Sequence, residues 1–566
     1  MSLQSNKKWV WPKKRVGLEE MSKTILDLRK IDDTDKFLNP KLEDIPDFNQ
    51  LYGAKEAAKK IIKTVKEGKK IVIHGDYDAD GICATTILWE FLYRELAKFL
   101  GKKVDVLPFI PSRVEQGYGL TDSSVEECME MGADLIVTVD CGVRDKELIN
   151  KYLKDKKVEF VITDHHQVPE DIDKDLNYPL VHQKFPKHEY SNVEVCGAFV
   201  AFLLVQAIKA EIGIEYKITQ DTQGLDLVAL ATITDIMELK SVNRVAVKYG
   251  LEQIKERKRL GLQKLIEKAE IDINQIDTYH LGFIIGPRIN ASGRIDSAID
   301  AVKLLLSKDP KVCTQLASKL DYLNYERQKM TGEALTEAKE MVDTEEKILC
   351  VLGGKWHEGI VGLVAGKLNE EFNRPTLVAT QANGEIKGSA RSISGFNITN
   401  ALEKCADYLE RFGGHEQAGG FTVRKGSWED FIGCMKKIAE KEITEEMLTP
   451  LLNIDLHIST NDISFKFLDI LKQLEPFGYG NRKPVVGFDK LVIVKKQPLG
   501  KIQIHLKLLC KGDGVELVTV LLFRCEEDVD NLKDDDVIDI VGNVNVNSWN
   551  GREQLQVIAK EWKYSV

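Results

Sequence analysis

The sequence lacks several features that would assign it quickly to a class of protein. None of its ten cysteines forms a Cys-x-x-Cys pair, which argues against a zinc ribbon or a disulfide framework and predicts a reducing, cytoplasmic location. The longest apolar run, residues 196–208, includes Gln206 and is too short to span a bilayer. The N-terminus carries no apolar segment followed by a small-residue cleavage site, so we expect no signal peptide.

The chain also lacks the excess of positive charge that is common in nucleic-acid-binding proteins. Its 79 Lys and Arg residues are outnumbered by 89 Asp and Glu residues, which gives a formal net charge of −10. If DNA is the partner, the positive surface must be local and a metal site must provide part of the attraction. The length of 566 residues predicts roughly three or four domains.

An apolar run that ends in alternating aspartates is the strongest signal that is present. Residues 71–81 read IVIHGDYDADG, so a β-branched run leads into His74 and then into Asp76, Asp78 and Asp80. We interpret the run as a buried strand that ends at the carboxyl edge of a parallel sheet, where α/β folds place their sites. Three carboxylates this close repel one another unless a cation lies between them, which favours a hard divalent metal ion. For this motif alone, the alternative is an acidic loop facing water.

Two further apolar runs end in the same way, and helical segments separate the three. The coincidence predicts an α/β fold with a parallel sheet and with its ligands on one edge. The two runs are residues 135–139, followed by Asp140, and residues 158–163, followed by Asp164, His165 and His166.

A lone carboxylate, Asp235, lies in an apolar stretch that we expect to be helical. A buried Asp needs a partner, which is either a metal ion or backbone N–H groups. With it, the chain offers a set of side chains suited to two ions, which can activate a bridging water for phosphoryl transfer. Carboxylates with two imidazoles favour Mn²⁺ or Mg²⁺ over a thiolate-type zinc site. The set comprises His74, Asp78, Asp80, Asp140, His165 and Asp235.

The second half of the chain predicts three further parts. Residues 313–342 keep helical spacing without proline and predict a long connecting helix between lobes. Residues 347–447 form another α/β segment, in which Ser389-Ala390-Arg391 and Gly413-Gly414-His415 either bind phosphate or mark turns. Arg288 and Arg294, in a glycine-rich stretch before the long helix, suit phosphate binding or a structural salt bridge equally well.

We expect residues 450–476 to form a helical bridge into a small barrel. From Leu491 the apolar pattern changes to a period of two, and Ile502 is one of the alternating residues. Asn550-Gly551 is a strong hairpin signal between two such runs. Five or so strands in this space predict an OB-fold, the commonest small barrel that binds single strands.

The motifs resemble those of a known family. HGDYDADG, VDCG, TDHHQ and the Asp235 segment are similar to the four metal motifs of the DHH phosphoesterase family. FIPSRVEQGYGL, GPRINASGRID, GSARSISGFNI, GGHEQAGG and EPFGYGN resemble those of the bacterial single-strand-specific exonucleases within it. The resemblance extends from about Phe37 to the end of the sequence, and the motifs occur in the expected order.

The resemblance implies a role for each candidate site residue. One ion would be held by His74, Asp78 and Asp140, and the other by Asp80, Asp140, His165 and Asp235, while Asp76 and Asp164 would orient these ligands. His166 would contact the scissile phosphate. A basic pocket for the 5′ phosphate would comprise Arg113, Arg294, Ser389 and Arg391 with His415 nearby, and Tyr118 would stack on or separate bases.

The resemblance also implies the domain organisation. A groove between the catalytic and associated domains would admit only an unpaired strand. We expect an N-terminal segment that packs on the core (1–49), a DHH catalytic domain (50–312), a connecting helix (313–344), a DHH-associated substrate-binding domain (345–447) and an OB-fold domain (448–566).

The function implied is metal-dependent hydrolysis of single-stranded DNA from the 5′ end to 5′ mononucleotides, in DNA repair and recombination. The family suggests a monomer, with a RecQ-type helicase and a single-strand-binding protein as possible partners and no membrane association. Some relatives carry a further C-terminal domain, so contacts that such a domain makes are left open here. The alternatives are a hydrolase of short RNAs or cyclic dinucleotides, a pyrophosphatase, and a non-catalytic DNA-binding scaffold. The barrel argues against the first two, and the complete ligand set argues against the last.

Overall fold

The protein consists of two compact units, which are described separately. The computed structural model describes residues 2–565 except 114–115, 118, 156, 170–171, 173–175, 186–187, 383, 501–502, 515–516 and 550–551. The larger unit comprises residues 40–443 and 478–480, and the smaller unit comprises residues 1–39, 444–477 and 481–566. The predictions made for Tyr118, Ile502 and the Asn550-Gly551 turn therefore lie outside the described residues. In the described part of the chain, no helix is both long enough and apolar enough to cross a membrane.

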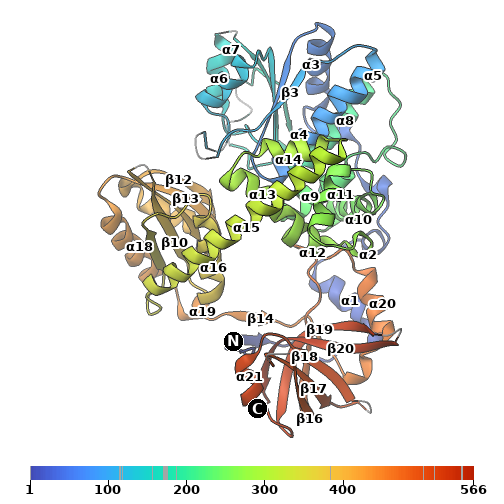
Figure 1. Ribbon diagram of the computed structural model, residues 1–566, viewed down its shortest axis with the longest axis vertical. Helices are drawn as coiled ribbons and strands as arrows, with labels where there is room; N and C mark the ends of the chain where they lie inside the picture. The colour runs from blue at the N-terminus through green and yellow to red at the C-terminus, as the bar shows by residue number, and fades with distance from the viewer. Residues whose placement is uncertain are drawn as a thin grey trace. The chain divides into compact units, whose positions relative to one another are not determined.

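The larger unit is built on a parallel five-stranded sheet with the strand order β3-β2-β4-β5-β6 (Figure 1). Successive residues of β2 point to opposite faces, so Ile71 and Ile73 join one apolar core and Val72 joins another. Helices α3, α4 and α8 contribute to the first core and α6 and α7 to the second. The predicted parallel sheet is therefore confirmed, and helices cover both of its faces. The strands are β2 (Ile71–Gly75), β3 (Val106–Phe109), β4 (Leu135–Val139), β5 (Glu159–Asp164) and β6 (Leu180–His182). The helices are α3 (Ala54–Lys66), α4 (Ala79–Glu90), α5 (Ala97–Leu100), α6 (Asp122–Glu130), α7 (Lys146–Lys154) and α8 (Gly197–Glu211).

A group of helices follows the sheet and ends in the longest helix of the described chain, α15 (Pro310–Met341). The side chain of Asp309 caps this helix by accepting hydrogen bonds from the N–H groups of Lys311 and Val312, and Pro310 occupies its first position. The long helix predicted over residues 313–342 is therefore confirmed. The preceding helices are α9 (Leu225–Thr234), α10 (Ser241–Lys255), α11 (Leu260–Lys268), α12 (Thr278–His280), α13 (Gly286–Ile295) and α14 (Ile299–Leu306).

A second sheet, with the order β12-β13-β11-β10-β9, forms the last part of the larger unit. Only the β9–β10 pair is parallel. A disulfide joins Cys405 to Cys434, which the scattered cysteines did not predict, and the other eight cysteines are free. The elements are β9 (Leu349–Gly353), β10 (Thr376–Ala382), β11 (Glu385–Arg391), β12 (Leu409–His415), β13 (Ala418–Val423), α16 (Val361–Phe372), α17 (Ile398–Lys404) and α18 (Trp428–Glu442).

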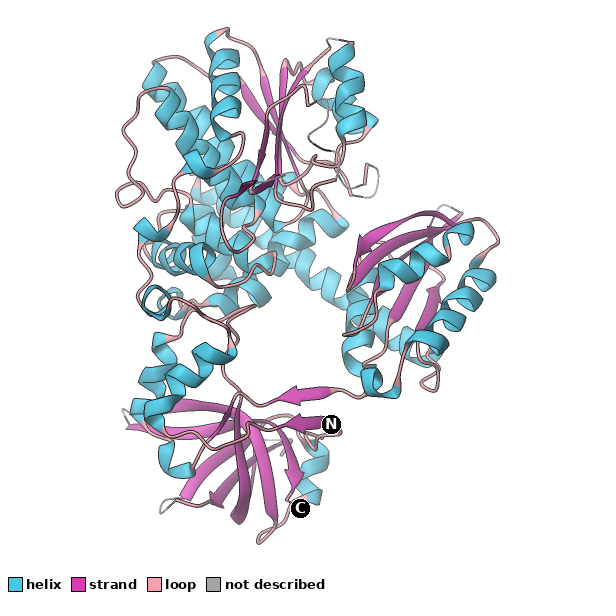
Figure 2. Cartoon of the chain, turned by 180° about the vertical axis from the view of Figure 1, so that it is seen from behind, coloured by secondary structure: helices cyan, strands magenta, loops and turns pink. Residues whose placement is uncertain are grey.

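The smaller unit contains a closed five-stranded barrel, which confirms the predicted OB-fold (Figure 2). The barrel closes because β16 pairs with both β17 and β19. Trp562 is fully buried in its core, as is Phe488. Its strands are β16 (Val486–Leu499), β17 (His505–Lys511), β18 (Leu517–Leu522), β19 (Val537–Trp549) and β20 (Arg552–Tyr564), and α21 (Glu526–Asn531) lies between β18 and β19.

The first 39 residues differ from the expectation that the N-terminal segment packs on the catalytic core. They belong to the same unit as the barrel, where α1 (Leu18–Leu28) buries Met21 and Ile25 in the barrel's apolar core. Residues 40–49 belong to the larger unit, as expected. The apolar pattern of α1 predicts that one face is buried but cannot reveal which distant surface covers it.

The helical bridge expected over residues 450–476 is wrong in its first half. Residues 451–453 form β14 (Leu451–Asn453), which pairs in parallel with β1 (Lys8–Val10), and β15 (Leu456–His457) extends the barrel sheet at β16. The second half is helical, as α20 (Phe465–Gln473). The extended conformation depends on a strand partner far earlier in the chain, which the local pattern does not show.

Candidate active site

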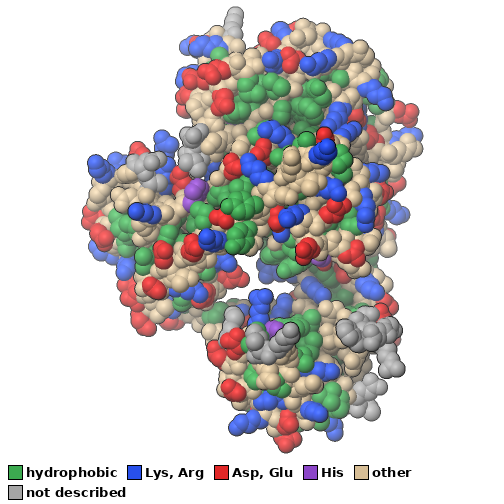
Figure 3. Space-filling model, viewed as in Figure 1, with side chains coloured by type: hydrophobic (Ala, Val, Ile, Leu, Met, Phe, Trp, Pro, Cys, Tyr) green, Lys and Arg blue, Asp and Glu red, His purple; other side chains and the backbone are tan. Residues whose placement is uncertain are grey.

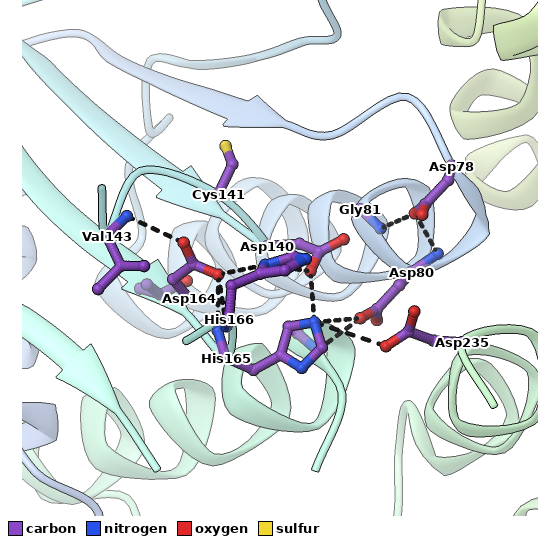
Figure 4. Close-up of polar contacts among 12 residues, drawn as sticks. Asp78, Asp80, Gly81, Asp140, Cys141, Val143, Asp164, His165, His166 and Asp235 are labelled. Carbon is purple, nitrogen blue, oxygen red and sulfur yellow. Dashed lines mark hydrogen bonds and ion pairs between the residues drawn. The ribbon is translucent and has the colours of Figure 1, made fainter. Parts of the chain in front are cut away.

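The first candidate ligands lie where β2 meets α4 (Figure 4). His74 is the penultimate residue of β2 and is fully buried. Asp78 caps α4, because its Oδ1 accepts hydrogen bonds from the N–H groups of Asp80 (2.9 Å) and Gly81 (3.1 Å). The alternating aspartates therefore occupy the start of a helix, where the N-terminal dipole stabilises negative charge.

Asp140 follows β4 with a left-handed backbone (φ 65°) and is buried against the N-terminus of α8. A Cβ atom on Gly197 would lie 2.7 Å from both Cβ and Oδ1 of Asp140, so glycine is required here. The N–H of Gly197 donates to Asp80 Oδ2 (2.6 Å) and the N–H of Ala198 donates to Asp80 Oδ1 (2.7 Å). The start of α8 thus fixes Asp80 and permits the close approach of Asp140.

The turn after β5 is organised by the buried carboxylate of Asp164. It accepts hydrogen bonds from the N–H groups of His165 (2.7 Å), His166 (3.1 Å) and Val143 (2.9 Å). It also lies 2.7 Å from His166 Nδ1. Burial opposes the charge on Asp164, but the hydrogen bond with His166, the charges of the two histidines and the hydrogen bond from Val143 together outweigh it, and the pKa of Asp164 is lowered. Burial likewise opposes the imidazolium, but the same hydrogen bond and the negative charges of Asp164, Asp80 and Asp76 together raise the pKa of His166.

His165 lies at the centre of the cluster. Its Nε2 atom is 3.1 Å from Asp140 Oδ1, 3.5 Å from Asp235 Oδ2 and 3.7 Å from Asp80 Oδ2 (Figure 4). Asp235, which we expected inside a helix, is the C-terminal cap of α9. Four segments far apart in the sequence therefore place side chains around one point.

Five buried polar atoms of the candidate ligands and of Asp76 have no hydrogen-bond partners among the described residues. Burial, followed by the neighbouring carboxylates, raises the pKa of Asp140 and of Asp235. Buried polar atoms without partners are costly, and carboxylate oxygens with imidazole nitrogens are ligands for Mn²⁺ or Mg²⁺, so the donor set fits divalent cations. The unpartnered atoms are His74 Nε2, Asp76 Oδ1, Asp140 Oδ1, His165 Nε2 and Asp235 Oδ2.

The structure thus brings the expected ligand residues to one edge of the sheet. Asp76, expected only to orient the ligands, lies among them, within ligand-atom distances of at most 4.8 Å of Asp78 and Asp140. The other groups at this spacing are Asp80 with His165 and Asp235, and Asp140 with His165 and His166.

Arginines form a separate cluster. The guanidinium of Arg113 lies over the ring of Tyr77, 5.2 Å from its centroid, and lines a cavity of about 420 Å³ with Arg294. Burial, then the charges of Arg113 and Arg327, lowers the pKa of Arg294 to about 10. Burial, then Arg113, also lowers the pKa of Arg391. Buried arginines that repel one another in this way favour the binding of an anion, which neutralises their charge.

The strand residues of this cluster lie against a helix start. Arg391 Nη1 donates to Ser389 Oγ (2.9 Å). A Cβ atom on Gly362, in the first turn of α16, would lie 3.1 Å from Ser389 Oγ and 3.3 Å from Arg391 Nη2. The close approach of a helix N-terminus adds positive potential to the pocket. His415 lies elsewhere, in a cavity of about 790 Å³ that it lines with His165, His166 and Asp235.

Several residues at the site were not predicted. Asn290 Oδ1 accepts a hydrogen bond from the N–H of Ala79 (2.7 Å), and Cys141 Sγ lies 3.6 Å from His74 Nδ1. Both lie in motifs quoted above, Asn290 in GPRINASGRID and Cys141 in VDCG, which were the signals that could have found them. His357 lines the arginine cavity, and its signal is the sequence WHEGIVG. His182 and Gln183 contact the turn after β5 from a strand without any motif.

Comparisons with known proteins identify the parts of this architecture. Residues 70–232 match the DHH family, N-terminal domain; residues 345–443 match the DHHA1 domain; and residues 454–561 match the RecJ OB domain. The chain is 33% identical to the single-stranded-DNA-specific exonuclease RecJ of Haemophilus influenzae, over 85% of this chain and 86% of that protein. The chain belongs to the RecJ family.

Other RecJ proteins extend the comparison. The Bacillus subtilis RecJ is 35% identical over 93% of this chain, which spans 65% of that relative's length. The crystal structure of Thermus thermophilus RecJ in complex with Mn²⁺ superposes with a TM-score of 0.81 and 28% identity, covering 99% of this chain and 80% of that one. That protein has also been solved with Mg²⁺. The RecJ domains account for the parallel sheet, the second sheet and the barrel described above.

Proposed function

We propose that this protein is a metal-dependent exonuclease that hydrolyses single-stranded DNA in the 5′ to 3′ direction to 5′ mononucleotides, in DNA repair and recombination. The observation that carries the proposal is the set of buried oxygen and nitrogen atoms without hydrogen-bond partners among the described residues, together with the carboxylates grouped around His165. Its donor types fit two divalent ions, Mn²⁺ or Mg²⁺, the ions bound by the Thermus relative. When bound, the two ions supply a water nucleophile and neutralise negative charge at the phosphate.

Each ligand has a proposed place. Asp140 is shared, because its left-handed backbone and the absence of a side chain on Gly197 bring its carboxylate to the centre of the cluster. One ion would be held by His74, Asp78 and Asp140, and the other by Asp80, Asp140, His165 and Asp235.

His166 acts on the substrate rather than on a metal. Its side chain lines the cavity beside the cluster, and the hydrogen bond with Asp164 keeps it protonated to higher pH. A protonated imidazole here would orient the scissile phosphate or donate a proton to the departing oxygen. Asp164 provides the negative charge that holds this ring in place.

The arginine cluster gives the enzyme its 5′ polarity. Arg113, Arg294 and Arg391 with Ser389 would bind the terminal phosphate, since a doubly charged anion relieves their mutual repulsion. His415 would contact the strand on the side of the larger cavity. Tyr118, expected to stack on or separate bases, lies outside the described residues.

The remaining parts of the proposal concern organisation. We retain residues 50–312 as the catalytic domain, 313–344 as the connecting helix and 345–447 as the substrate-binding domain, with an OB-fold that binds the incoming strand. The enzyme would act as a monomer in the cytoplasm, and a RecQ-type helicase and a single-strand-binding protein would supply and cover its substrate.

Digestion of end-labelled oligonucleotides tests the proposal. Single- and double-stranded substrates would be incubated with Mn²⁺, with Mg²⁺ and with chelator. We expect mononucleotides only from single strands, only from the 5′ end and only with metal. Tight binding without cleavage would favour the scaffold, and cleavage confined to oligomers of a few nucleotides would favour a short-RNA hydrolase.

A further inference from the structure

His182, the last residue of β6, and Gln183, which follows the strand, contact the turn that carries His165 and His166. Both are buried, with 1% and 2% of their surface exposed. His182 Nε2 lies 2.8 Å from the carbonyl oxygen of His166, and Gln183 Nε2 donates to the carbonyl oxygen of His165 (3.3 Å). Each side chain thus holds the backbone of one histidine.

The ring of His182 has a defined protonation pattern. Its Nδ1 accepts a hydrogen bond from the N–H of Lys184 (2.9 Å), so Nδ1 carries no proton. Nε2 therefore carries the proton and donates it to the carbonyl of His166. A neutral ring with both nitrogens used is a rigid support, because rotation would break two hydrogen bonds in a buried place.

Gln183 links two parts of the metal cluster. Its Oε1 accepts a hydrogen bond from the N–H of Val195, while its Nε2 binds the carbonyl of His165. Val195 lies two residues before Gly197, whose N–H binds the carboxylate of Asp80. One amide side chain therefore connects the backbone at His165 with the segment that fixes Asp80.

We propose that His182 and Gln183 are positioning residues with separate effects on the two histidines. Gln183 sets the metal affinity of the centre through His165 and Asp80, whereas His182 sets the placement of His166 against the scissile phosphate. The inference rests on the proposed function. Partners that orient metal ligands typically change metal affinity or activity by 10–100-fold when they are removed.

The test of Gln183 is Mn²⁺ binding, measured by electron paramagnetic resonance of free Mn²⁺ without substrate. Gln183→Met keeps the length of the side chain but removes both hydrogen bonds, and we expect the dissociation constant to rise about tenfold or more. Gln206→Met is the matched control, because Gln206 is equally buried in α8 and its amide has no partner among the described residues. The control should change the constant less than about twofold.

The test of His182 is the turnover number, kcat, measured together with the Mn²⁺ dissociation constant. His182→Leu should lower kcat about tenfold while leaving the Mn²⁺ dissociation constant within about twofold of wild type. His182→Gln, whose Nε2 can donate to the same carbonyl, should recover most of kcat. A general loss of packing would not produce this separation between the two variants.

The outcomes are distinguishable. Equal Mn²⁺ affinity for Gln183→Met and Gln206→Met, or a loss of Mn²⁺ affinity in His182→Leu as large as in Gln183→Met, would overturn the inference. Failure of the wild-type protein to bind Mn²⁺ would overturn the proposed function and the inference with it. Thermal melting in chelator shows whether each variant is folded. If Gln183→Met does not fold, Gln183→Asn replaces it, because its side chain is too short to reach both partners, and the same rise in the dissociation constant is expected.

Discussion

The carboxylate centre is a cluster of negative side chains and the arginine pocket is a cluster of positive ones, and different parts of the fold supply their residues. The ligands of the centre lie at strand ends of one sheet and at the adjoining helix ends, whereas the arginines come from a loop after β3, from α13 and from β11. In both, burial favours the neutral form: it raises the pKa of Asp140 and lowers the pKa of Arg294 to about 10. An ion of opposite charge would therefore stabilise each cluster, a metal cation in one and, as proposed above, a phosphate in the other.

The largest effect should come from the shared ligand. Asp140→Asn keeps the shape of the side chain but removes the charge that both ions would share, so we expect hydrolysis to fall at least about a thousandfold, or ~4 kcal/mol. Steady-state digestion of a labelled single strand with Mn²⁺ measures the loss. Asp105→Asn is the control, since Asp105 is exposed at the opposite end of β3 and pairs only loosely with Lys70 (3.8 Å). Turnover near the wild-type rate by folded Asp140→Asn would contradict the assignment of the centre.

A smaller and more selective loss should follow in the arginine pocket. Arg391→Ala removes one of the cations that would hold the terminal phosphate, and we expect the preference for 5′-phosphorylated over 5′-hydroxyl strands to fall about tenfold. Competition between the two substrates measures the preference directly. Lys387→Ala, on the same strand but engaged with Glu358 and Glu385 at the surface, should leave it unchanged. Equal slowing on both substrates would show that Arg391 does not bind the phosphate.

The two clusters also differ in how far the sequence predicts them. Much of the centre could be predicted because most of its ligands lie at the end of an apolar strand or shortly after it, so local pattern and sheet topology suffice for them. Asp235 is different, because it caps the helix α9. Arg113, Arg294 and Arg391 have no common local pattern, and only the family resemblance grouped them. His182 and Gln183 could not be predicted, because their role depends on hydrogen bonds to carbonyl groups that carry no side-chain signature.

The fold shows the same limit. The parallel sheet, the long helix and the barrel follow from periodicity and agree with the structure. The position of the first 39 residues and the extended conformation of β14 do not, because both depend on partners hundreds of residues away in the chain. The apolar pattern of a helix or strand predicts which of its faces is buried, but it does not predict which part of the chain covers that face.

Without metal, the stability of the carboxylate centre should depend on pH. Carboxyl groups with a raised pKa retain protons in the folded state that the unfolded state releases. The free energy of unfolding should therefore fall as pH rises from about 7 to about 8, a range in which the buried imidazoles of His74 and His165, whose pKa values are lowered, are neutral in the folded state and largely neutral in the unfolded state. Thermal or urea denaturation in chelator measures this slope. Mn²⁺ at about a hundredfold excess over its dissociation constant should add ~2.7 kcal/mol at the higher pH. A metal-free protein that gains stability over the same pH range would contradict the shared burial of these carboxylates.

The smallest effect should be the stabilisation of the protein by an anion bound in the arginine pocket. There the cations repel one another, so a 5′-deoxymononucleotide at about tenfold excess over its dissociation constant should stabilise the protein by ~1.4 kcal/mol in chelator. Arg391→Ala should remove most of this gain in stability, because the pocket then has less cationic repulsion for the phosphate to relieve and one cation fewer to bind it. Asp140→Asn should retain the gain, because Asp140 is not part of the pocket. Thermal shift with the 5′-phosphate and with the 5′-hydroxyl nucleoside separates phosphate binding from base stacking. Equal shifts in melting temperature with the two compounds would mean that the pocket recognises the base, and the arginine cluster would then not be an anion site.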